Sequence, residues 1–373
     1  MDKRSVPEID KEAYEIWENC KRSIMKAAKE MGVPLGTFKS RLFRHKKRLA
    51  TDAQAMDGYI VKGTSTLFNK DGELVAQWVK TTVDRERMQE LLVAALAAMN
   101  EKVRPVKAVP GPMTYNADLL ALYVLSDYHL GVFAHADEGG ADWSTEIAEA
   151  GLYKWADMAV DTAPPAHTAL FLQNGDFLHF DGLFPVTPKS RHVLDADSRF
   201  TKIVRAGIKA IIYAVKRMLE KHQHVHIIMS DGNHDESSSV WLREMLFVLY
   251  ENEPRVTVDR TEKPYYAFEW GQTSIFAHHG DKRNINNVSE VVTALYYEIF
   301  GRTKHRYCHL GHVHHSASKD NGLMHVIVHP TLAARDAYAA RYGYISQRKA
   351  RTFIYHKQYG EVGMTAITPE MLL

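Results

Sequence analysis

The chain has 373 residues, of which 45% are hydrophobic and 25% are charged, as in an ordinary globular protein. Two cysteines are too few for a disulfide framework, which favours a reducing compartment. No apolar run reaches the roughly 18 residues of a membrane span, and the beginning, MDKRSVPEID, lacks the apolar core of a signal peptide. The sequence therefore predicts a cytoplasmic protein with no membrane partner.

Positive charge is concentrated in the first 50 residues. The whole chain has a net charge of +2, whereas residues 1–50 hold 13 Lys and Arg against 7 Asp and Glu, a balance of +6. No acidic side chain occurs between residues 36 and 50, and the basic ones there are Lys39, Arg41, Arg44, Lys46, Lys47 and Arg48. A one-sided patch of this kind predicts binding to a phosphate backbone. A solvated helix face, the other interpretation, usually mixes both signs.

The same segment, SIMKAAKEMGVPLGTFKSRLFRHKKRL, predicts two helices joined by a tight turn. In the first helix the apolar residues recur at helical spacing up to Met31, and Gly32 ends the helix before a Val-Pro turn. Leu35, Phe38 and Leu42 are expected to line the inner face of the second helix. The segment resembles the helix-turn-helix of bacterial and phage DNA-binding proteins, whose second helix enters the major groove.

This resemblance implies that DNA is a partner and that the outward side chains of the second helix contact it. These are Thr37, Lys39, Ser40, Arg41, Arg44, Lys46 and Lys47. The motif is degenerate, so an αα-hairpin without DNA-binding function stays the alternative. Residues 1–50 are accordingly expected to form a small helical domain, and a homodimer is compatible with the sequence.

Residues 51–117 are predicted to connect this domain to the next. The stretch 58–81 has two strand-like runs around a turn at 69–72, which is typical of a hairpin. An amphipathic helix is expected from Asp84 to about Lys102. The sequence VRPVKAVPGPMTYN, with three prolines and a glycine, predicts a linker over 103–116. The second domain is therefore expected to span residues 118–373.

The second domain shows one arrangement five times, an apolar, strand-like run that stops at polar residues. The five runs are LLALYVLSDYH, TALFLQNGD, VHIIMSDGNH, TSIFAHHGD and RYCHLGHVH. Residues just past the carboxyl ends of buried strands meet in one crevice of an α/β fold, so we expect these polar residues to come together. They supply two carboxylates, four imidazoles and one amide: Asp127, Asp176, His129, His279, His312, His314 and Asn233.

Such a donor set is what two divalent cations sharing a bridging carboxylate need. Histidines without cysteine favour Mn, Fe or Zn over Mg or Ca, and we expect Mn. Two such cations contribute +4 and the two carboxylates −2, so the loaded site attracts an anion. Metal ions about 3.5–4 Å apart can clamp a phosphoryl group and generate hydroxide near neutral pH. The sequence thus predicts a metal-dependent phosphoesterase.

The motifs DYH, GD, GNHD, HG and GHVH occur in this order and resemble the calcineurin-like metallophosphoesterases, over residues 118 to about 330. That family has an α/β (α+β) fold, a two-sheet β-sandwich flanked by helices. The final RTFIYHKQYGEVGMTAI is expected to supply closing strands. The resemblance implies that Asp127, His129 and His314 bind one metal ion. It implies that Asn233, His279 and His312 bind the other, and that Asp176 bridges them.

The resemblance also implies roles for three further residues. His234 would point at the scissile phosphate and stabilise the transition state or protonate the leaving oxygen, while Asp235 would hold its ring. The sequence GDFLH differs from the phosphoprotein phosphatases, which read G-D-x-V-D-R-G, and is similar to the SbcD-type DNA-repair nucleases. In those enzymes the histidine at the place of His179 helps to position the phosphodiester. A structural role for His179 at a sheet edge stays the alternative.

Two departures separate the chain from those nucleases. Only 59 residues follow His314, which leaves little room for their capping and ATPase-docking segments, so no ATPase partner is implied. The helix-turn-helix is also foreign to them, and the arrangement looks like metallophosphoesterases of phages and prophages. We expect a two-metal phosphodiesterase, a nuclease hydrolysing DNA through a metal-bridging hydroxide and brought to DNA by residues 1–50. The alternatives are a phosphoprotein or small-molecule phosphatase, and a DNA-binding regulator with a vestigial esterase domain.

Overall fold

The computed structural model describes residues 6–51, 59–69, 74–83, 90, 109–188 and 192–372. The chain divides into two compact units, Met1–Leu92 and Val93–Leu373. Within the described residues, no helix is both long and apolar enough to cross a membrane. Apart from Glu90, the helix expected at 84–102 lies outside the described residues.

The first unit begins with three helices, α1 (Val6–Asn19), α2 (Ile24–Glu30) and α3 (Leu35–Thr51). Their small core consists of Ala13, Trp17, Ala27, Ala28, Phe38 and Leu42. Gly32 has a φ of 65°, which suits its place in the turn after α2. The expectation that Leu35 faces inward is wrong, because it is the first residue of α3 and the core begins one turn later; its side chain is 41% exposed.

A two-stranded hairpin follows in the same unit. β1 (Tyr59–Phe68) and β2 (Leu74–Val83) pair antiparallel, with Tyr59 opposite Val83. They occupy the segment in which alternating runs predict a hairpin. The turn residues 70–73 lie outside the described residues.

The larger sheet of the second unit has six strands in the order β13-β12-β3-β4-β5-β6. Its strands are β3 (Asn116–Leu125), β4 (Ala166–Asn174), β5 (His224–Ser230), β6 (Val256–Val258), β12 (Ala350–His356) and β13 (Gly360–Ile367). β3 to β6 are parallel, so their carboxyl ends share one edge of the sheet. β12 and β13 are antiparallel neighbours that extend the sheet beyond β3, as expected of the closing strands.

The second sheet has five strands in the order β10-β11-β9-β8-β7. Its strands are β7 (Tyr266–Trp270), β8 (Thr273–Ala277), β9 (His305–Leu310), β10 (Ala317–Asp320) and β11 (His325–Val328). β8, β9 and β11 are parallel, whereas β7 and β10 are antiparallel edge strands. Two of the motif-bearing runs, β8 and β9, therefore end at the same edge of this sheet.

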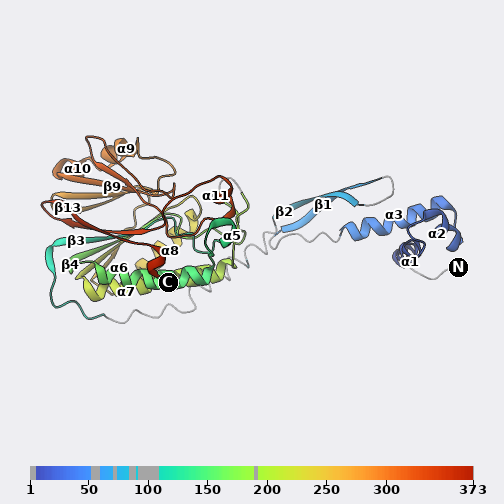
Figure 1. Ribbon diagram of the computed structural model, residues 1–373, viewed down its shortest axis with the longest axis horizontal. Helices are drawn as coiled ribbons and strands as arrows, with labels where there is room; N and C mark the ends of the chain where they lie inside the picture. Colours follow the sequence, from blue (N-terminus) through green and yellow to red (C-terminus); the bar gives the residue numbers. More distant parts are fainter. Residues whose placement is uncertain are drawn as a thin grey trace. The chain divides into compact units, whose positions relative to one another are not determined.

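Helices cover the outer faces of both sheets (Figure 1). The helices of this unit are α5 (Ala136–Gly139), α6 (Thr145–Thr162), α7 (Phe200–Lys221), α8 (Glu236–Leu249), α9 (Val288–Leu295), α10 (Tyr297–Arg302), α11 (Ala337–Arg341) and the 3-10 helix η1 (Pro369–Leu372). α6 and α7 run side by side against the six-stranded sheet, and α9 and α10 lie on the five-stranded sheet. α8 packs against β5 and β6.

The sequence of β3 is apolar at successive positions and does not alternate with polar residues, because both faces of the strand are buried. Leu120, Leu122 and Val124 belong to the core between the two sheets. Tyr123 and Leu125 point the other way, into the core beneath the helices. A strand that is buried on both faces must be apolar at every position. The predicted fold class, a two-sheet α/β sandwich flanked by helices, is confirmed.

The helix-on-sheet core can be tested at Trp155 in α6, whose side chain is 1% exposed. Trp155→Ala is expected to lower the free energy of unfolding by about 3–5 kcal/mol, because it removes a buried ring and leaves a cavity. Lys154→Ala changes the exposed neighbouring position and should stay within about 0.5 kcal/mol of wild type. Urea unfolding followed by circular dichroism measures both, and equal losses would contradict this packing.

Candidate metal centre

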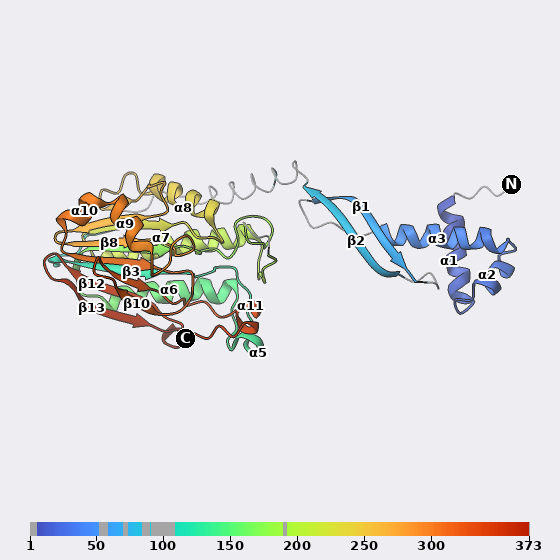
Figure 2. The same ribbon diagram turned by 90° about the horizontal axis from the view of Figure 1, so that it is seen from above.

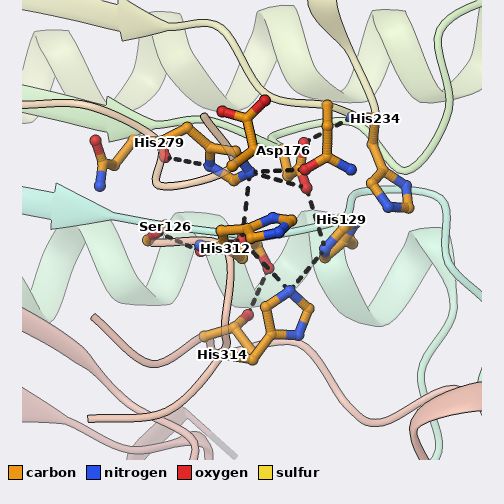
Figure 3. Close-up of polar contacts among 12 residues, drawn as sticks. Ser126, His129, Asp176, His234, His279, His312 and His314 are labelled. Carbon is orange, nitrogen blue, oxygen red and sulfur yellow. Dashed lines mark hydrogen bonds and ion pairs between the residues drawn. The ribbon is translucent and has the colours of Figure 1, made fainter. Parts of the chain in front are cut away.

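All seven predicted ligands lie just past the carboxyl ends of five strands. Asp127 and His129 follow β3, Asp176 follows β4, and Asn233 follows β5. From the other sheet, His279 follows β8, and His312 and His314 follow β9. The two sheets thus contribute to one cluster of polar side chains, seen close up in Figure 3.

One group of donors consists of Asp127, His129 and His314, whose ligand atoms all lie within 4.8 Å of one another. His314 Nε2 is 3.3 Å from Asp127 Oδ1 and 3.2 Å from His129 Nε2. These are the three residues predicted for one metal ion. The structure therefore brings them together.

The second group consists of Asp176, His279 and His312, again within 4.8 Å of one another. His279 Nε2 is 3.2 Å from Asp176 Oδ2 and 3.2 Å from Asn233 Oδ1. Asp176 Oδ2 also lies 3.9 Å from His129 Nε2 of the first group. The carboxylate predicted to bridge the two ions is thus within reach of both groups.

The ligand positions have an unusual backbone. Seven described non-glycine residues have positive φ, and five of them are predicted ligands. They are Asp127 (51°), His129 (47°), Asp176 (50°), His312 (70°) and His314 (55°). A left-handed residue costs on the order of 1–3 kcal/mol and persists only where its surroundings hold it, which is typical of functional sites.

Hydrogen bonds between the turns hold this backbone. Asp127 N donates to Gly175 O at 3.1 Å, and His129 N donates to Asp176 O at 3.0 Å. His312 N donates to both carboxylate oxygens of Asp127, at 2.9 and 3.0 Å, and His234 N donates to Asp176 Oδ1 at 2.8 Å. Each carboxylate is therefore oriented by the main chain of another turn.

The two carboxylates are almost completely buried, at 0% and 1% exposure for Asp127 and Asp176. Burial by itself raises the pKa of Asp176, but His279, His234 and His129 outweigh it and hold this pKa well below its usual range. Burial lowers the pKa of His279, yet Asp176 and Asp127 raise it to about 10. The two carboxylates thus favour positive charge at this place.

The donor set fits divalent transition-metal ions. Each group offers imidazole nitrogens and a carboxylate oxygen close enough to share one ion, and Asn233 adds an amide oxygen. The main chain orients the ring of His279, as a metal-binding histidine requires, because His279 Nδ1 donates to Asn174 O at 2.9 Å. A bound cation would supply the positive charge that the two carboxylates favour.

His234 and His179 lie beside the first group of donors. His234 Nδ1 donates to the carbonyl of His179 at 2.8 Å, which fixes the ring and leaves Nε2 for other partners. The ring centroid of His234 is 4.7 Å from that of His129. The His179 ring is only 2% exposed and stacks on His234 with centroids 5.6 Å apart. His179 is therefore placed to position its two neighbouring histidines.

Asp235 does not hold the His234 ring, which corrects that expectation. Its Oδ2 accepts a hydrogen bond from Leu178 N at 2.9 Å, and its Oδ1 has no partner among the described residues. Burial and the nearby Asp176 raise the pKa of Asp235 to about 8. The carbonyl of His179 takes over the expected role, a contact that a pattern of side chains cannot reveal.

The predicted DNA-contact residues all belong to the first unit, on α3. Thr37, Lys39 and Ser40 are exposed, and the side chains of Lys46 and Lys47 lie outside the described residues. Arg44 is exposed as well, and its guanidinium also pairs with the fully buried Asp10. Arg44 Nε and Nη2 donate to the two Asp10 oxygens at 2.9 and 2.7 Å, which ties α3 to α1.

Arg41 has a lesser contact of the same kind. It is half-buried, and its Nη1 is 3.7 Å from Met31 Sδ. Of the predicted contact residues whose side chains the structure describes, Thr37, Lys39, Ser40 and Arg44 are thus exposed, whereas Arg41 is half-buried. Ser40 Oγ donates to Gly36 O at 3.0 Å, within its own helix.

Two residues of the site have no place in the motifs. Ser126 Oγ donates to Asp127 Oδ2 at 2.5 Å, and Thr331 Oγ1 donates to the carbonyl of Asp127 at 2.5 Å. Ser126 could have been suspected from its place directly before DYH. Thr331 lies 204 residues along the chain from Asp127, and nothing in the sequence marks the contact.

Neither the comparison with protein-family models nor that with curated proteins finds a match. Solved structures do match. One, described as a predicted phosphoesterase from Streptococcus pneumoniae, is 14% identical, with 68% of this chain and 92% of that chain covered and a TM-score of 0.32. A novel archaeal phosphodiesterase is 12% identical, with coverages of 66% and 98% and a TM-score of 0.33.

A dimetal phosphatase from Danio rerio is 7% identical to the chain. The match covers 67% of this chain and 99% of that one, with a TM-score of 0.35. Similarity at this level concerns the fold and says nothing of what this chain binds or acts on.

The packing of the ligand turns can be tested at Gly232, where an added Cβ would lie 2.1 Å from both the N and Oδ1 atoms of Asp176. Gly232→Ala is expected to displace Asp176 and lower metal affinity about 10–100-fold. Gly182→Ala is the matched control, because its Cβ meets nothing within 4 Å. Titration with Mn²⁺ or Zn²⁺ measures both affinities. Equal affinities would show that the position of Asp176 does not decide metal binding.

Proposed function

We propose that the chain is a two-metal-dependent phosphodiesterase. The main supporting observation is that the Asp176 carboxylate lies near both donor groups. Its Oδ2 is 3.9 Å from His129 Nε2 in one group and 3.2 Å from His279 Nε2 in the other. Two divalent ions, when bound, would polarise the phosphoryl oxygens and supply a nucleophile at neutral pH. Mn is proposed, with Fe or Zn as alternatives, from the imidazole-rich donors.

The residues of the chain would then position and protonate the substrate. His234 is fixed through Nδ1 by the His179 carbonyl, so its Nε2 can donate to a phosphoryl or leaving oxygen when the ring is protonated. His179 keeps this arrangement in place from its buried position. Asp127 and Asp176 are oriented by main-chain donors before any ion binds, which is the preorganisation that catalysis needs.

DNA is the proposed substrate, with the first unit as the targeting element. The supporting observations are the excess of positive charge in residues 1–50 and the exposed Lys39 on the second helix of a helix-turn-helix sequence. GDFLH, which resembles the nuclease branch, supports a diester over a monoester. Phosphoprotein phosphatase activity is the competing outcome.

The metal centre is tested by two substitutions with different readouts. Asp176→Asn is expected to lower the metal content below about two ions per chain and to remove most hydrolysis of bis-p-nitrophenyl phosphate, because the carboxylate serves both ions. His234→Ala should lower kcat about 10²–10⁴-fold with metal content near that of wild type. His315→Ala, which changes an exposed histidine of the loop after β9, is the control and should change neither.

Elemental analysis and steady-state kinetics supply these measurements. The diester should be cleaved faster than p-nitrophenyl phosphate. Rapid hydrolysis of a phosphopeptide by a protein that leaves diesters and DNA intact would instead establish the phosphatase alternative. A protein that binds no divalent ion would overturn the proposal altogether.

The targeting element is tested by single substitutions in the full chain. Lys39→Ala should weaken binding to duplex DNA and make its salt dependence shallower by about 0.9 in the logarithmic slope, as expected for one lost phosphate contact. Lys11→Ala removes the same charge from α1, where the side chain is 68% exposed, and should have a smaller effect. The affinities of both variants for duplex DNA are measured at several salt concentrations. A larger effect of Lys39→Ala supports DNA binding by α3, whereas equal effects of the two variants would indicate general charge attraction.

A further inference from the structure

The segment between β11 and β12 carries three exposed tyrosines whose rings form a row. Tyr338, Tyr342 and Tyr344 are 56%, 64% and 59% exposed. The ring centroids of Tyr338 and Tyr342 are 4.6 Å apart, and those of Tyr342 and Tyr344 are 6.0 Å apart with planes inclined by 16°. Adjacent large rings in water are unusual on a protein surface unless the surface binds something. We call these three residues the tyrosine row.

Local backbone structure holds the tyrosine row in place. The Asp336 carboxylate caps α11 by accepting from Ala339 N at 2.8 Å. Gly343, with a φ of 69°, reverses the chain after the helix, and Tyr344 N donates to Ala339 O at 3.0 Å. The rings are thus presented by a capped helical turn. α11 itself lies beside α5, as both Figure 1 and Figure 2 show.

Both ends of this segment are attached to the metal centre. Thr331 Oγ1 donates to the carbonyl of Asp127 at 2.5 Å, and Ser346 Oγ donates to the carbonyl of His314 at 2.7 Å. Asp127 and His314 both belong to the first donor group. Ser346 is two residues from Tyr344, a span of at most about 7 Å of chain. The tyrosine row therefore borders the metal centre.

The charge of the segment suits an anionic polymer. Residues 331–350 carry four basic side chains, Arg335, Arg341, Arg348 and Lys349, and one acidic side chain, Asp336. The acidic one is engaged in capping α11, and Arg335 and Arg348 donate to the carbonyls of Gly139 and Leu332, so the exposed basic side chain of the segment is Arg341. Arg341 is exposed and lies between Tyr338 and Tyr342 in the sequence. Aromatic rings interleaved with basic side chains are typical of surfaces that stack bases and track a phosphate backbone.

We infer that the tyrosine row is a stacking platform for the unpaired bases of a single-stranded nucleic acid whose backbone enters the metal centre. The inference rests on the proposed phosphodiesterase function and gives it a substrate class. A base has an aromatic face whatever its identity, so such a platform binds single strands without sequence preference. Paired bases within a duplex are stacked on one another and cannot occupy the rings.

The test compares Tyr342→Ala with two other variants of the full-length protein. Tyr342 is the central ring of the row, and Tyr342→Phe keeps the aromatic face. Tyr359→Ala is the matched control: this tyrosine is 66% exposed and stacks on His356, with centroids 4.4 Å apart. It follows β12 at the end where His356 pairs with Leu119, so it lies at the amino end of β3, opposite the metal centre.

Binding is measured first, by fluorescence anisotropy of labelled oligothymidylate and of a duplex of equal length, with EDTA present so that nothing is cleaved. Tyr342→Ala should weaken single-strand binding about 5- to 150-fold, the range for the loss of one stacked base. Tyr342→Phe and Tyr359→Ala should bind like wild type, and duplex binding should not change in any variant. Equal single-strand affinities of Tyr342→Ala and wild type, or an equal loss on the duplex, would overturn the inference.

Hydrolysis then separates this inference from the proposed function. With Mn²⁺, Tyr342→Ala should cleave bis-p-nitrophenyl phosphate at the wild-type rate and the oligothymidylate with a reduced kcat/KM. A wild-type protein that cleaves neither substrate would defeat the proposed function, while the anisotropy measurement would still decide the role of the row. Oligothymidylate cleavage at the wild-type rate by Tyr342→Ala, at substrate concentrations below KM, would count against the row.

Discussion

The seven predicted ligands can converge on one place only where the backbone that carries them turns sharply after each strand. Five of the predicted ligands have a left-handed backbone conformation for this reason, at an energetic cost of order 1–3 kcal/mol each. The turns are held because they donate hydrogen bonds to one another, as when His312 N reaches the Asp127 carboxylate. The sandwich of sheets behind them supplies the rigid ends from which such turns can be built.

The same arrangement creates an electrostatic demand. Two carboxylates with almost no exposure to solvent would repel each other if nothing positive lay between them. The effect is seen at His279: Asp176 and Asp127 raise its pKa to about 10, although burial acts in the opposite direction. Divalent ions satisfy the demand more fully, so metal binding and the stability of the centre should depend on each other.

Much of the fold and of the ligand cluster could be predicted from the sequence. Apolar runs followed by Asp, His or Asn mark the ends of strands, and these ends converge in an α/β protein. The sequence was less informative where a main-chain atom makes the contact, as with the His179 carbonyl that accepts a hydrogen bond from the His234 ring. Arg44 shows another limit: its charge predicts a contact with DNA, but no local pattern marks its ion pair with Asp10, 34 residues earlier. Contacts between distant segments, such as Thr331 with Asp127, leave no local pattern.

The position of β12 has a consequence for the time at which the centre can form during synthesis. β12 pairs with β3, with Arg351 opposite Val124, so two neighbouring strands are made 227 residues apart. At about 5–20 residues per second, some ten to fifty seconds separate them. Until then β3 has one open edge, and the core between the sheets lacks Phe353 and Tyr355. The short-range helices of the first unit can fold meanwhile, so this unit would be complete before the metal centre on a nascent chain.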